Sequence, residues 1–497
     1  MNYVLSIDQG TTGTRSMIFN KEGEEISKNY INHEQIFPHP GWVEHNPSEI
    51  WENTLLTIKR TLSLKKIAPS EISAIGITNQ RETIVAWDKS TCLPLHNAIV
   101  WQCRRTSDIC EQLKQEGYSE LFKGKTGLVI DPYFSGTKIS WLLENSKKVS
   151  EAYKSNNLLV GTIDSWLIWN LTGKHVTDYS NASRTLLFNI HKGEWDQELL
   201  EILKVPLDIL PEVRPSSDKE SYGTVRSEVL SSQIPVSGNA GDQQAALFGQ
   251  TCFDKGSVKN TYGTGNFMLL NTGETAVKSE KGLLTTIAWK LDNTITYALE
   301  GSVFITGAAI QWLEEGLNIL DDKGELTKIM QSVPSTEGIF FVPAFVGLGA
   351  PHWDPYARGT LLGLTRGTTR EHIIRATLES ICYQSEDVFE IMRKESGIDI
   401  NLLRVDGGIT QCSPLLQFQS DISKTIVQKP TVMETTALGA AYLAGLATDY
   451  WEDLADIKSN FLIDEEYSPN MSDDNRNHLL DTWQKAVDRA KKWASIP

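Results

Sequence analysis

The N-terminal part of the chain alternates short apolar runs with glycine-rich or charged breaks. YVLSID and TRSMIFN are predicted strands joined by the glycine-threonine segment DQGTTGTR, residues 8–15, and a third strand ends near His33. An amphipathic helix is predicted from Pro47 to Leu62, and the apolar strand ISAIGIT follows and continues into NQRET, residues 79–83. Strands that alternate with helices predict an α/β architecture.

A similar pattern returns in the second half of the chain. VKNTYGTGNFMLLNTGE, residues 258–274, again places a Gly-Thr-Gly turn between two strand-like runs. Both turns share Gly, Thr and Gly rather than the Asn-Gly or Asp-Gly of common hairpins. We interpret the two segments as a weak internal repeat, with a chance likeness between two hairpins as the alternative.

Length and loop composition suggest how the chain is divided. A chain of 497 residues is too long for one core and predicts two or three domains. Residues 210–225, rich in Pro, Ser and charge, predict a surface loop, whereas IPVSGNAGDQQAALFGQ, residues 234–250, reads as a strand, loop and helix of the first half. We therefore predict domains over residues 1–251 and 252–497. The last helix has a packing stripe formed by Leu479, Leu480, Trp483, Val487 and Ala490.

Composition and charge exclude several classes of function. No run of eighteen apolar residues is present, and the N-terminus lacks a basic region followed by an apolar stretch, so we expect a cytoplasmic protein without membrane insertion. A net charge of −16 would repel a phosphate backbone, which argues against nucleic acid as a partner. Six cysteines without a Cys-x-x-Cys pair predict reduced thiols.

The two glycine-threonine turns are candidates for phosphate binding, because glycine lets backbone N–H groups approach a ligand closely. Asp8 leaves the first strand where it could reach a phosphate-bound magnesium ion, and Arg15 could offset charge on a transferred group. Each of these residues also has an ordinary explanation, since Asp forms turns and Arg is common on surfaces.

Two polar clusters suggest further chemistry. Asp242, in AGDQQAALFG, stands at a predicted helix start, where it is either an N-cap or a general base for phosphoryl transfer. Arg81 and Glu82 follow a buried strand, where they form either a local ion pair or a site for a polyhydroxy compound.

Gly307 and Gln311 share one helix face, which suits an adenine slot or close helix packing.

The motifs together resemble the FGGY family of carbohydrate kinases, part of the larger group of actin-like ATPases. The resemblance runs from the first strand to the last helix and rests on order and spacing: DQGTTGTR, NQRET, VWQCRRT, DPYFSGTK, AGDQQAALFGQ, YGTGNF, GLGAPHWDPYARGTLLGLTRGT and VDGG. It implies two ribonuclease-H-like domains that flank a central cleft. It also implies that ATP and Mg²⁺ serve to phosphorylate glycerol to sn-glycerol 3-phosphate with release of ADP, in a homodimer or homotetramer.

The resemblance also implies roles for individual residues. The glycerol hydroxyls would be held by Arg81, Glu82, Tyr133, Asp242 and Gln243, the glycerol carbons would pack on Trp101 and Phe267, and Asp242 would be the general base. The phosphates would face Thr11, Thr12, Gly13, Arg15 and Thr264, Mg²⁺ would face Asp8, and the nucleoside would face Gly307, Gln311 and Gly408.

Three departures from the family pattern stand out. Gly13 occupies a position where relatives usually carry a hydroxyl residue, so this contact can only be a backbone amide, and we expect the loop to hold phosphate more through its backbone than its relatives do. Cys412 stands on the adenine side, where many relatives have Asn. SYGTVRSEVLSSQIPVSG, residues 221–238, lacks both the glycine-rich sugar-bisphosphate loop and the phosphorylated histidine of some relatives, so we expect neither form of regulation.

Two other functions remain open from the sequence. One is a sister kinase for a larger sugar, such as xylulose or gluconate, although NQRET with DPYFSGTK and Trp101 favours the three-carbon glycerol. The other is a non-catalytic, nucleotide-operated binding protein of the same fold, which would have no need for Arg81, Glu82 and Asp242 together.

Overall fold

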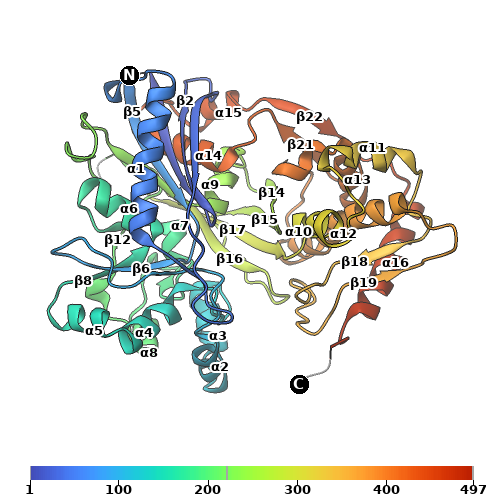
Figure 1. The fold of residues 1–497 in the computed structure, drawn as a ribbon, viewed down its shortest axis with the longest axis horizontal. Coiled ribbons are helices and arrows are strands. Elements are labelled where there is room, and N and C mark those ends of the chain that lie inside the picture. Colours follow the sequence, from blue (N-terminus) through green and yellow to red (C-terminus); the bar gives the residue numbers. More distant parts are fainter. Residues whose placement is uncertain (1, 220–221, 495–497) are drawn as a thin grey trace.

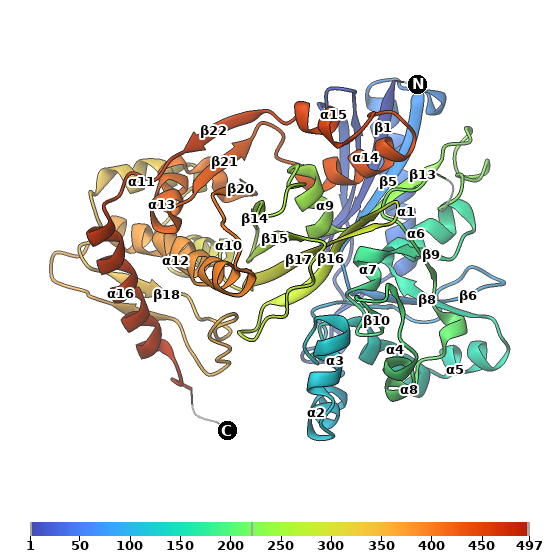
Figure 2. The ribbon, with the colours of Figure 1, turned by 180° about the vertical axis from the view of Figure 1, so that it is seen from behind.

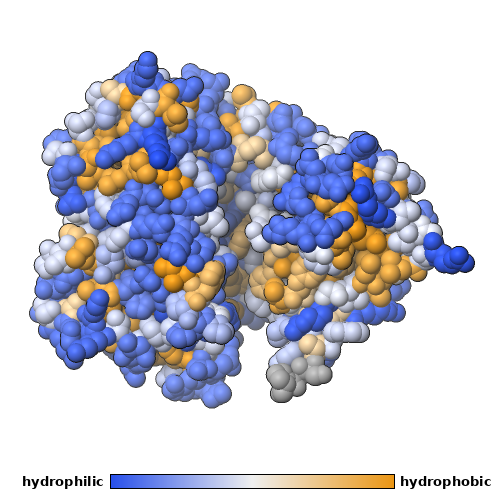
Figure 3. All heavy atoms as spheres, in the orientation of Figure 1, coloured by the Kyte–Doolittle hydropathy of each residue, from blue (hydrophilic) through white to orange (hydrophobic). Residues whose placement is uncertain are grey.

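Two lobes stand side by side, each built around a β-sheet with helices packed on it (Figures 1 and 2). This computed structural model describes residues 2–219 and 222–494. A deep hollow separates the lobes on the face shown in Figure 3. The chain is therefore organised around two sheets with a depression between them.

The sheet of the first lobe has the strand order β13-β5-β1-β2-β3. Its strands are β1 (Tyr3–Gln9), β2 (Gly13–Phe19), β3 (Glu25–Asn32), β5 (Ile72–Asn79) and β13 (Val236–Gly241). The first three are antiparallel neighbours, while β5 is parallel to both β1 and β13. The strands predicted from the apolar runs of this region are confirmed.

The sheet of the second lobe repeats this topology. β14 is antiparallel to β15 and parallel to β20, β15 is antiparallel to β17, and β20 is parallel to β21. In this order, β14, β15, β17, β20 and β21 correspond to β1, β2, β3, β5 and β13 of the first lobe. The predicted internal repeat is therefore confirmed. The seven strands are β16 (Leu284–Leu291), β17 (Thr294–Val303), β15 (Asn266–Gly273), β14 (Val258–Tyr262), β20 (Leu402–Asp406), β21 (Ile426–Pro430) and β22 (Ile463–Tyr467).

Smaller sheets complete both lobes. A four-stranded sheet of the first lobe contains β4 (Glu44–His45), β7 (Ala98–Ile99), β6 (Ile84–Asp88) and β8 (Leu158–Thr162). Three two-stranded sheets pair β9 (Val176–Asp178) with β12 (Glu212–Arg214), β10 (Phe188–Asn189) with β11 (Glu194–Trp195), and β18 (Phe340–Val342) with β19 (Thr360–Leu362).

The helices of the first half lie around the first sheet and its four-stranded neighbour (Figure 1). They are α1 (Pro47–Leu64), α2 (Ser107–Gln115), α3 (Ser119–Thr126), α4 (Ser135–Asn145), α5 (Lys147–Lys154), α6 (Ile163–Thr172), α7 (Tyr179–Ala182), α8 (Gln197–Leu203) and α9 (Asp242–Gly249). The helix predicted from Pro47 is confirmed as α1, whose side chain cap is Asn46.

The helices of the second half are α10 (Gly307–Gln311), α11 (Leu326–Ser332), α12 (Arg370–Ser396), α13 (Ser413–Ser423), α14 (Thr435–Ala447), α15 (Leu454–Ser459) and α16 (Asp473–Ala490). In α16 the predicted stripe is confirmed as a packing face, because Trp483, Val487 and Ala490 are buried in the core of the second lobe. All six cysteines are free thiols. Within the described ranges, no helix is both long enough and apolar enough to cross a membrane.

Helix α14 comes from the second half of the sequence but packs on the sheet of the first lobe. Alternate residues of that sheet point to opposite faces: Leu5 and Ile7 pack with α1 and α6, and Val4 packs with α14. Two strand glycines let the helix backbone approach, because a Cβ at Gly76 would lie 2.0 Å from the Ala440 carbonyl oxygen and one at Gly238 would lie 2.4 Å from the Ala444 nitrogen. The two halves of the chain are thus joined by a close backbone contact.

The same helix contacts α9 just as closely. A Cβ at Gly439 would lie 1.8 Å from the carbonyl oxygen of Ala245, and a Cβ at Gly249 would lie 2.0 Å from that of Thr435. Neither oxygen belongs to a flexible side chain, so no local adjustment makes room for a side chain. Glycine at these positions sets the distance between α9 and α14.

The prediction of a surface loop over residues 210–225 is wrong in part. Glu212–Arg214 form β12, which pairs in parallel with β9. Ser216 is buried and donates to Asp178, and the buried Tyr222 donates to the carbonyl oxygen of Pro215 at 2.6 Å. Because Pro, Ser and charged residues dominate the segment, its composition concealed these buried contacts. Residues 220 and 221, the second of which begins the segment expected to lack both known forms of regulation, lie outside the described residues.

We predict that Gly439→Ala destabilises the protein by about 1–3 kcal/mol or more, because the added methyl group overlaps the backbone of α9. Urea denaturation followed by circular dichroism would measure this loss. The control is Gly124→Ala in α3, where a Cβ meets no atom within 4 Å and a small gain in helix stability is expected. Equal stability of the two variants would contradict the close contact.

Candidate functional site

Arg81 and Glu82 follow the carboxyl end of β5, as predicted, and both side chains are buried. Nε of Arg81 lies 3.2 Å from Oδ1 of Asp242, so the predicted substrate pair and the predicted base share one site. Glu82 has a φ of +61°, a conformation that a non-glycine residue holds only under constraint from its surroundings. Its backbone is fixed by Ser135, whose hydroxyl donates to the Glu82 carbonyl oxygen at 3.0 Å.

Arg81 and Glu82 are part of a larger cluster of charged side chains that the sequence analysis missed. Glu300 on β17 of the second lobe accepts hydrogen bonds from both terminal nitrogens of Arg81. Arg184 donates from Nε to Glu82 at 2.7 Å and from one terminal nitrogen to Glu300 at 2.9 Å. Two arginines and two glutamates thus alternate in a buried cluster that spans both lobes. No motif marked Arg184 or Glu300, since their partners are distant in the sequence.

The charges of this cluster depend on one another. Burial raises the pKa of Glu82, although Arg184 and Arg81 oppose the shift. Burial also raises the pKa of Glu300, but the positive charges of Arg184 and Arg81 together have the larger effect and lower it to about 2. Because that value lies below the ordinary 4.5, Glu300 is ionised at neutral pH and keeps both arginines paired.

Aromatic rings border the charged groups. The rings of Trp101 and Tyr133 meet edge to face at 5.5 Å, and the guanidinium of Arg184 lies 5.7 Å from the centre of Tyr133. Phe267, on β15 of the second lobe, lies 6.0 Å from the guanidinium of Arg81. Trp101 and Phe267, predicted to pack on the glycerol carbons, and Tyr133, predicted to hold a hydroxyl, therefore lie at the same site as the charged groups, and they come from both lobes.

Asp242 is the first residue of α9, directly after β13. Its Oδ1 accepts the backbone N–H of Gln243 at 2.7 Å, and its side chain is 30% exposed. Burial raises the pKa of Asp242, while the Arg81 charge lowers it. A partly exposed carboxylate beside an arginine at a helix N-terminus is suited to accept a proton from a bound hydroxyl group.

Lys259 is a third residue that the sequence analysis missed, after Arg184 and Glu300. It lies on β14 of the second lobe, and its Nζ donates to Oε1 of Gln243 and, at 2.9 Å, to the Thr261 hydroxyl. Burial lowers its pKa to about 8, against the pull of Asp406 and Asp242. This lysine anchors the amide of Gln243 and contributes positive charge beside Asp242.

The first glycine-threonine loop is a tight turn between β1 and β2. The N–H of Gly10 donates to the carbonyl oxygen of Gly13 at 2.9 Å. The hydroxyl of Thr11 accepts from the Trp101 indole at 2.9 Å, which ties the loop to the aromatic wall. Thr12 is exposed, and its hydroxyl lies 3.0 Å from that of Tyr30. The loop predicted to bind phosphate therefore borders the candidate substrate site.

Asp8 and Arg15 face each other across β1 and β2. Burial raises the pKa of Asp8 to about 6; Arg15 lowers it, and the charges of Asp242 and Glu434 raise it. Arg15 forms an ion pair with Glu434, the residue before α14, and so links the loop to the second half of the chain.

Asp8 can bind a magnesium ion only together with other ligands such as substrate phosphates and water. No group of three or more His, Cys, Asp or Glu side chains in the described part of the chain could hold a metal ion. Magnesium at kinase sites is usually bound through one or two carboxylates plus substrate phosphates and water. The single carboxylate of Asp8 is suited to that kind of binding. The negative charges of Asp242 and Glu434 lie close enough to raise its pKa.

The second glycine-threonine loop connects β14 and β15 and packs against the start of α10. Gly307 donates its N–H to the Gly263 carbonyl oxygen at 3.0 Å, and the Thr264 carbonyl oxygen accepts from Ala308 at 3.1 Å. A Cβ at Gly307 would lie 2.6 Å from the Gly263 oxygen, so this contact requires glycine. Gln311 is exposed on the following turn and donates to Glu315 at 2.9 Å.

The two remaining nucleoside-side residues follow β20. Gly408 begins a 3₁₀ turn, and a Cβ there would meet no atom within 4 Å. Cys412 is only 3% exposed, and its sulfur lies 3.7 Å from Sδ of Met330. Because this thiol is enclosed in the core of the second lobe, we leave its predicted nucleotide contact out of the site.

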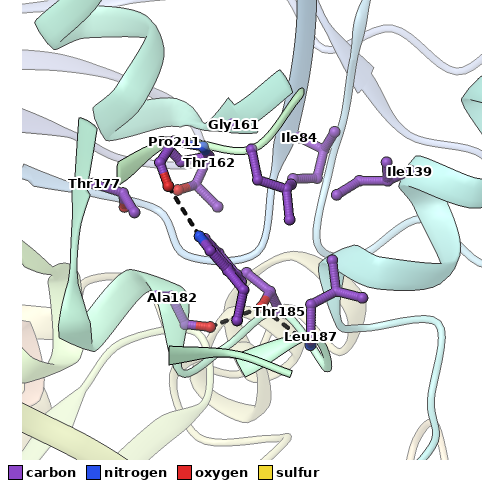
Figure 4. Close-up of a pocket in the computed structure, with 11 residues that line it drawn as sticks. Ile84, Ile139, Gly161, Thr162, Thr177, Ala182, Thr185, Leu187 and Pro211 are labelled. Atoms are coloured by element: carbon purple, nitrogen blue, oxygen red, sulfur yellow. Dashed lines mark hydrogen bonds between the residues drawn. The ribbon is translucent and has the colours of Figure 1, made fainter. Parts of the chain in front are cut away.

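The cavity in Figure 4 is separate from this chemistry. It has a volume of about 10 Å³, room for roughly one water molecule, and none of the predicted site residues lines it. Ile84, Ile139 and Leu187 supply apolar walls, and Thr162 and Thr185 supply hydroxyls. We regard it as a packing defect of the first lobe.

We predict that Glu300→Gln lowers the free energy of unfolding by about 3 kcal/mol, because the change leaves two buried arginines short of a counter-charge. Urea denaturation would measure the loss. The control is Glu52→Gln, an exposed position of α1 where an effect within about 0.5 kcal/mol is expected. A Glu300 variant as stable as the control would show that the cluster is not held by these ion pairs.

Comparison with known proteins identifies the family to which this site belongs. Residues 3–249 match the N-terminal domain, and residues 258–448 the C-terminal domain, of the FGGY family of carbohydrate kinases. Glycerol kinase 2 of Thermotoga maritima is 56% identical over 99% of both chains. Glycerol kinase 1 of Clostridium tetani is also 56% identical, again over 99% of both chains.

Solved structures agree with the sequence comparison. The Plasmodium falciparum glycerol kinase with ADP superposes with a TM-score of 0.93 at 39% identity, covering 99% of this chain and 98% of that one. A xylulose kinase from Lactobacillus acidophilus shares the fold, with a TM-score of 0.85 at 23% identity, covering 99% of this chain and 97% of that one. The predicted two-domain, actin-like ATPase fold is confirmed. The chain belongs to the FGGY family of carbohydrate kinases.

Proposed function

We propose that this kinase transfers the γ-phosphoryl group of ATP to glycerol, forming sn-glycerol 3-phosphate and ADP. The observation that carries the proposal is that Arg81, Glu82 and Asp242 lie close together beside the rings of Trp101 and Tyr133. Relatives that are 56% identical over nearly the whole chain and bear the name glycerol kinase support the same substrate.

The site suits a small polyol. Arg81 offers hydrogen-bond donors and Glu82 offers acceptors, so a hydroxyl group, which donates and accepts, satisfies both. Tyr133 and Gln243 would complete the polar contacts, while Trp101 and Phe267 would cover the carbons and exclude water. Arg184, Glu300 and Lys259 would act indirectly, because they hold Arg81, Glu82 and Gln243 in place.

Asp242 would accept the proton of the attacking glycerol hydroxyl. As that oxygen bonds to the γ-phosphorus, the bond from phosphorus to the β,γ-bridging oxygen breaks and ADP leaves with the electron pair. Phosphoryl transfer of this kind demands orientation more than strong basicity. The Arg81 contact and the N–H of Gln243 fix the Asp242 carboxylate, which meets that demand.

The nucleotide would lie along the two glycine-threonine loops. Backbone and hydroxyl groups of Thr11, Thr12, Gly13 and Thr264 would hold the phosphates, and Gly307, Gln311 and Gly408 would border the nucleoside. Arg15 would exchange Glu434 for phosphate when the nucleotide binds. Asp8 would hold Mg²⁺, which neutralises phosphate charge when bound. The ADP named for the Plasmodium falciparum structure supports nucleotide binding.

Location and assembly stay predictions. We infer a cytoplasmic enzyme, since its cosubstrate ATP is made there and its cysteines are all free thiols. A homodimer or homotetramer remains an expectation from the family resemblance.

We predict that Asp242→Asn lowers kcat for glycerol-dependent ADP formation by about 10²- to 10⁴-fold, because the amide cannot accept the proton. A coupled ADP-release assay would measure this. The matched control is Asp208→Asn on the exposed surface, which should keep full activity. A loss within about tenfold, roughly 1.4 kcal/mol of barrier, would exclude Asp242 as the essential base.

The pH profile adds a second readout for the same residue. Because burial raises the pKa of Asp242 above its ordinary 3.8, kcat should fall on acidification at a higher pH than an exposed aspartate would give. The Asp242→Asn enzyme should lack this acid limb, and an identical limb in both enzymes would assign it to another group.

We predict that glycerol is phosphorylated with a higher kcat/KM than xylulose or gluconate, because the aromatic wall and the Arg81 and Glu82 pair suit a short chain. A panel of polyols and sugars in the ADP-release assay would test the substrate. A clear preference for xylulose or gluconate would favour a sister kinase, whereas nucleotide binding without any phosphorylated acceptor would favour a non-catalytic binding protein.

A further inference from the structure

Position 13 of the first phosphate loop has no room for a side chain. A Cβ on Gly13 would lie 2.5 Å from the hydroxyl oxygen of Tyr30 and 2.5 Å from the carbonyl oxygen of Ile31. Tyr30 lies on the neighbouring strand β3, and its phenol fills the space above the glycine. The loop therefore lacks a side chain at position 13 but has a hydroxyl group in that place.

The strand register puts this phenol on the same face as the phosphate chemistry. Asp8 on β1 pairs with Arg15 on β2, and Arg15 pairs with Tyr30 on β3. Residues directly opposite in antiparallel strands share a face of the sheet, as do residues two apart in one strand. Asp8, Arg15 and Tyr30 thus form one row, and Gly13 lies on the same face as that row.

The contacts of Tyr30 tie it to the loop. Its hydroxyl lies 3.0 Å from that of Thr12, and the Arg15 guanidinium lies 5.5 Å from its ring centre. Tyr30 is 42% exposed. A phenol both donates and accepts, so when the Thr12 hydroxyl donates to Tyr30 the phenolic O–H is left to donate elsewhere.

We propose that Tyr30 is a further nucleotide-binding residue, whose phenolic O–H donates to the phosphate chain in the place that a side chain at position 13 would occupy. This inference rests on the proposed function, since it assumes that the loop binds a nucleoside triphosphate. It adds a side-chain donor at position 13, where only a backbone amide was expected. The ring has a second role, because it lies beside the Arg15 guanidinium.

The test is Tyr30→Phe, which removes the hydroxyl and keeps the ring beside Arg15. Isothermal titration calorimetry should show about tenfold weaker binding of a non-hydrolysable ATP analogue with Mg²⁺, because one hydrogen bond to a charged group is lost. Binding of adenosine, which has no phosphate, should be unchanged. The KM for ATP should rise while the KM for glycerol stays within about twofold.

The control is Tyr153→Phe on α5, a partly exposed tyrosine of the first lobe outside the site. It should bind the analogue like the wild type, and all three proteins should melt at the same temperature. Unchanged analogue affinity in Tyr30→Phe, or an equal loss of adenosine affinity, would overturn the proposal. If the wild type bound the analogue but phosphorylated no glycerol, the proposed function would fail while the Tyr30 test still gave its answer.

Discussion

The close backbone contact between α9 and α14 is the constraint on which the site depends. Asp242 begins α9, and α14 begins just after Glu434, so both helices present chemistry at their first turns. Gly249 and Gly439 bring the two backbones together at a distance that no side chain permits. Because α14 also packs on Gly76 and Gly238 of the first sheet, it joins the second half of the chain to β1, which carries Asp8, and to β5, which leads into Arg81.

The buried ion pairs add a second link between the lobes. Glu300 belongs to the second lobe but holds Arg81 and Arg184 of the first. Removing two arginines and two glutamates from water is costly, and the cluster is stable only while every charge keeps its partner. Phe267 and Lys259 also reach the site from the second lobe. A change in the angle between the lobes would therefore disturb the substrate pocket itself, which couples lobe position to catalysis.

Local patterns predicted much of the fold, and long-range pairings escaped them. The strands β1, β2 and β5 and the helix α1 follow from apolar runs and periodicity, and the repeat of β1 and β2 by β14 and β15 followed from shared turn residues. Arg81, Glu82 and Asp242 were found because each stands at the end of an element. Arg184 and Glu300 lie inside segments with no signal of their own, and only the fold brings them to Glu82 and Arg81.

Position 13 of the first phosphate loop also shows that local sequence patterns do not predict long-range contacts. In the sequence, Gly13 supplies no hydroxyl group, and no local pattern points to Tyr30 as a substitute. In the fold, β3 lies beside β2 and brings the Tyr30 phenol to the vacant space, next to Thr12 and Arg15. Glycine is required at position 13, because a Cβ there would lie 2.5 Å from both the Tyr30 hydroxyl oxygen and the Ile31 carbonyl oxygen. The proposed phosphate donor thus comes from a neighbouring strand, which only the fold brings next to the loop.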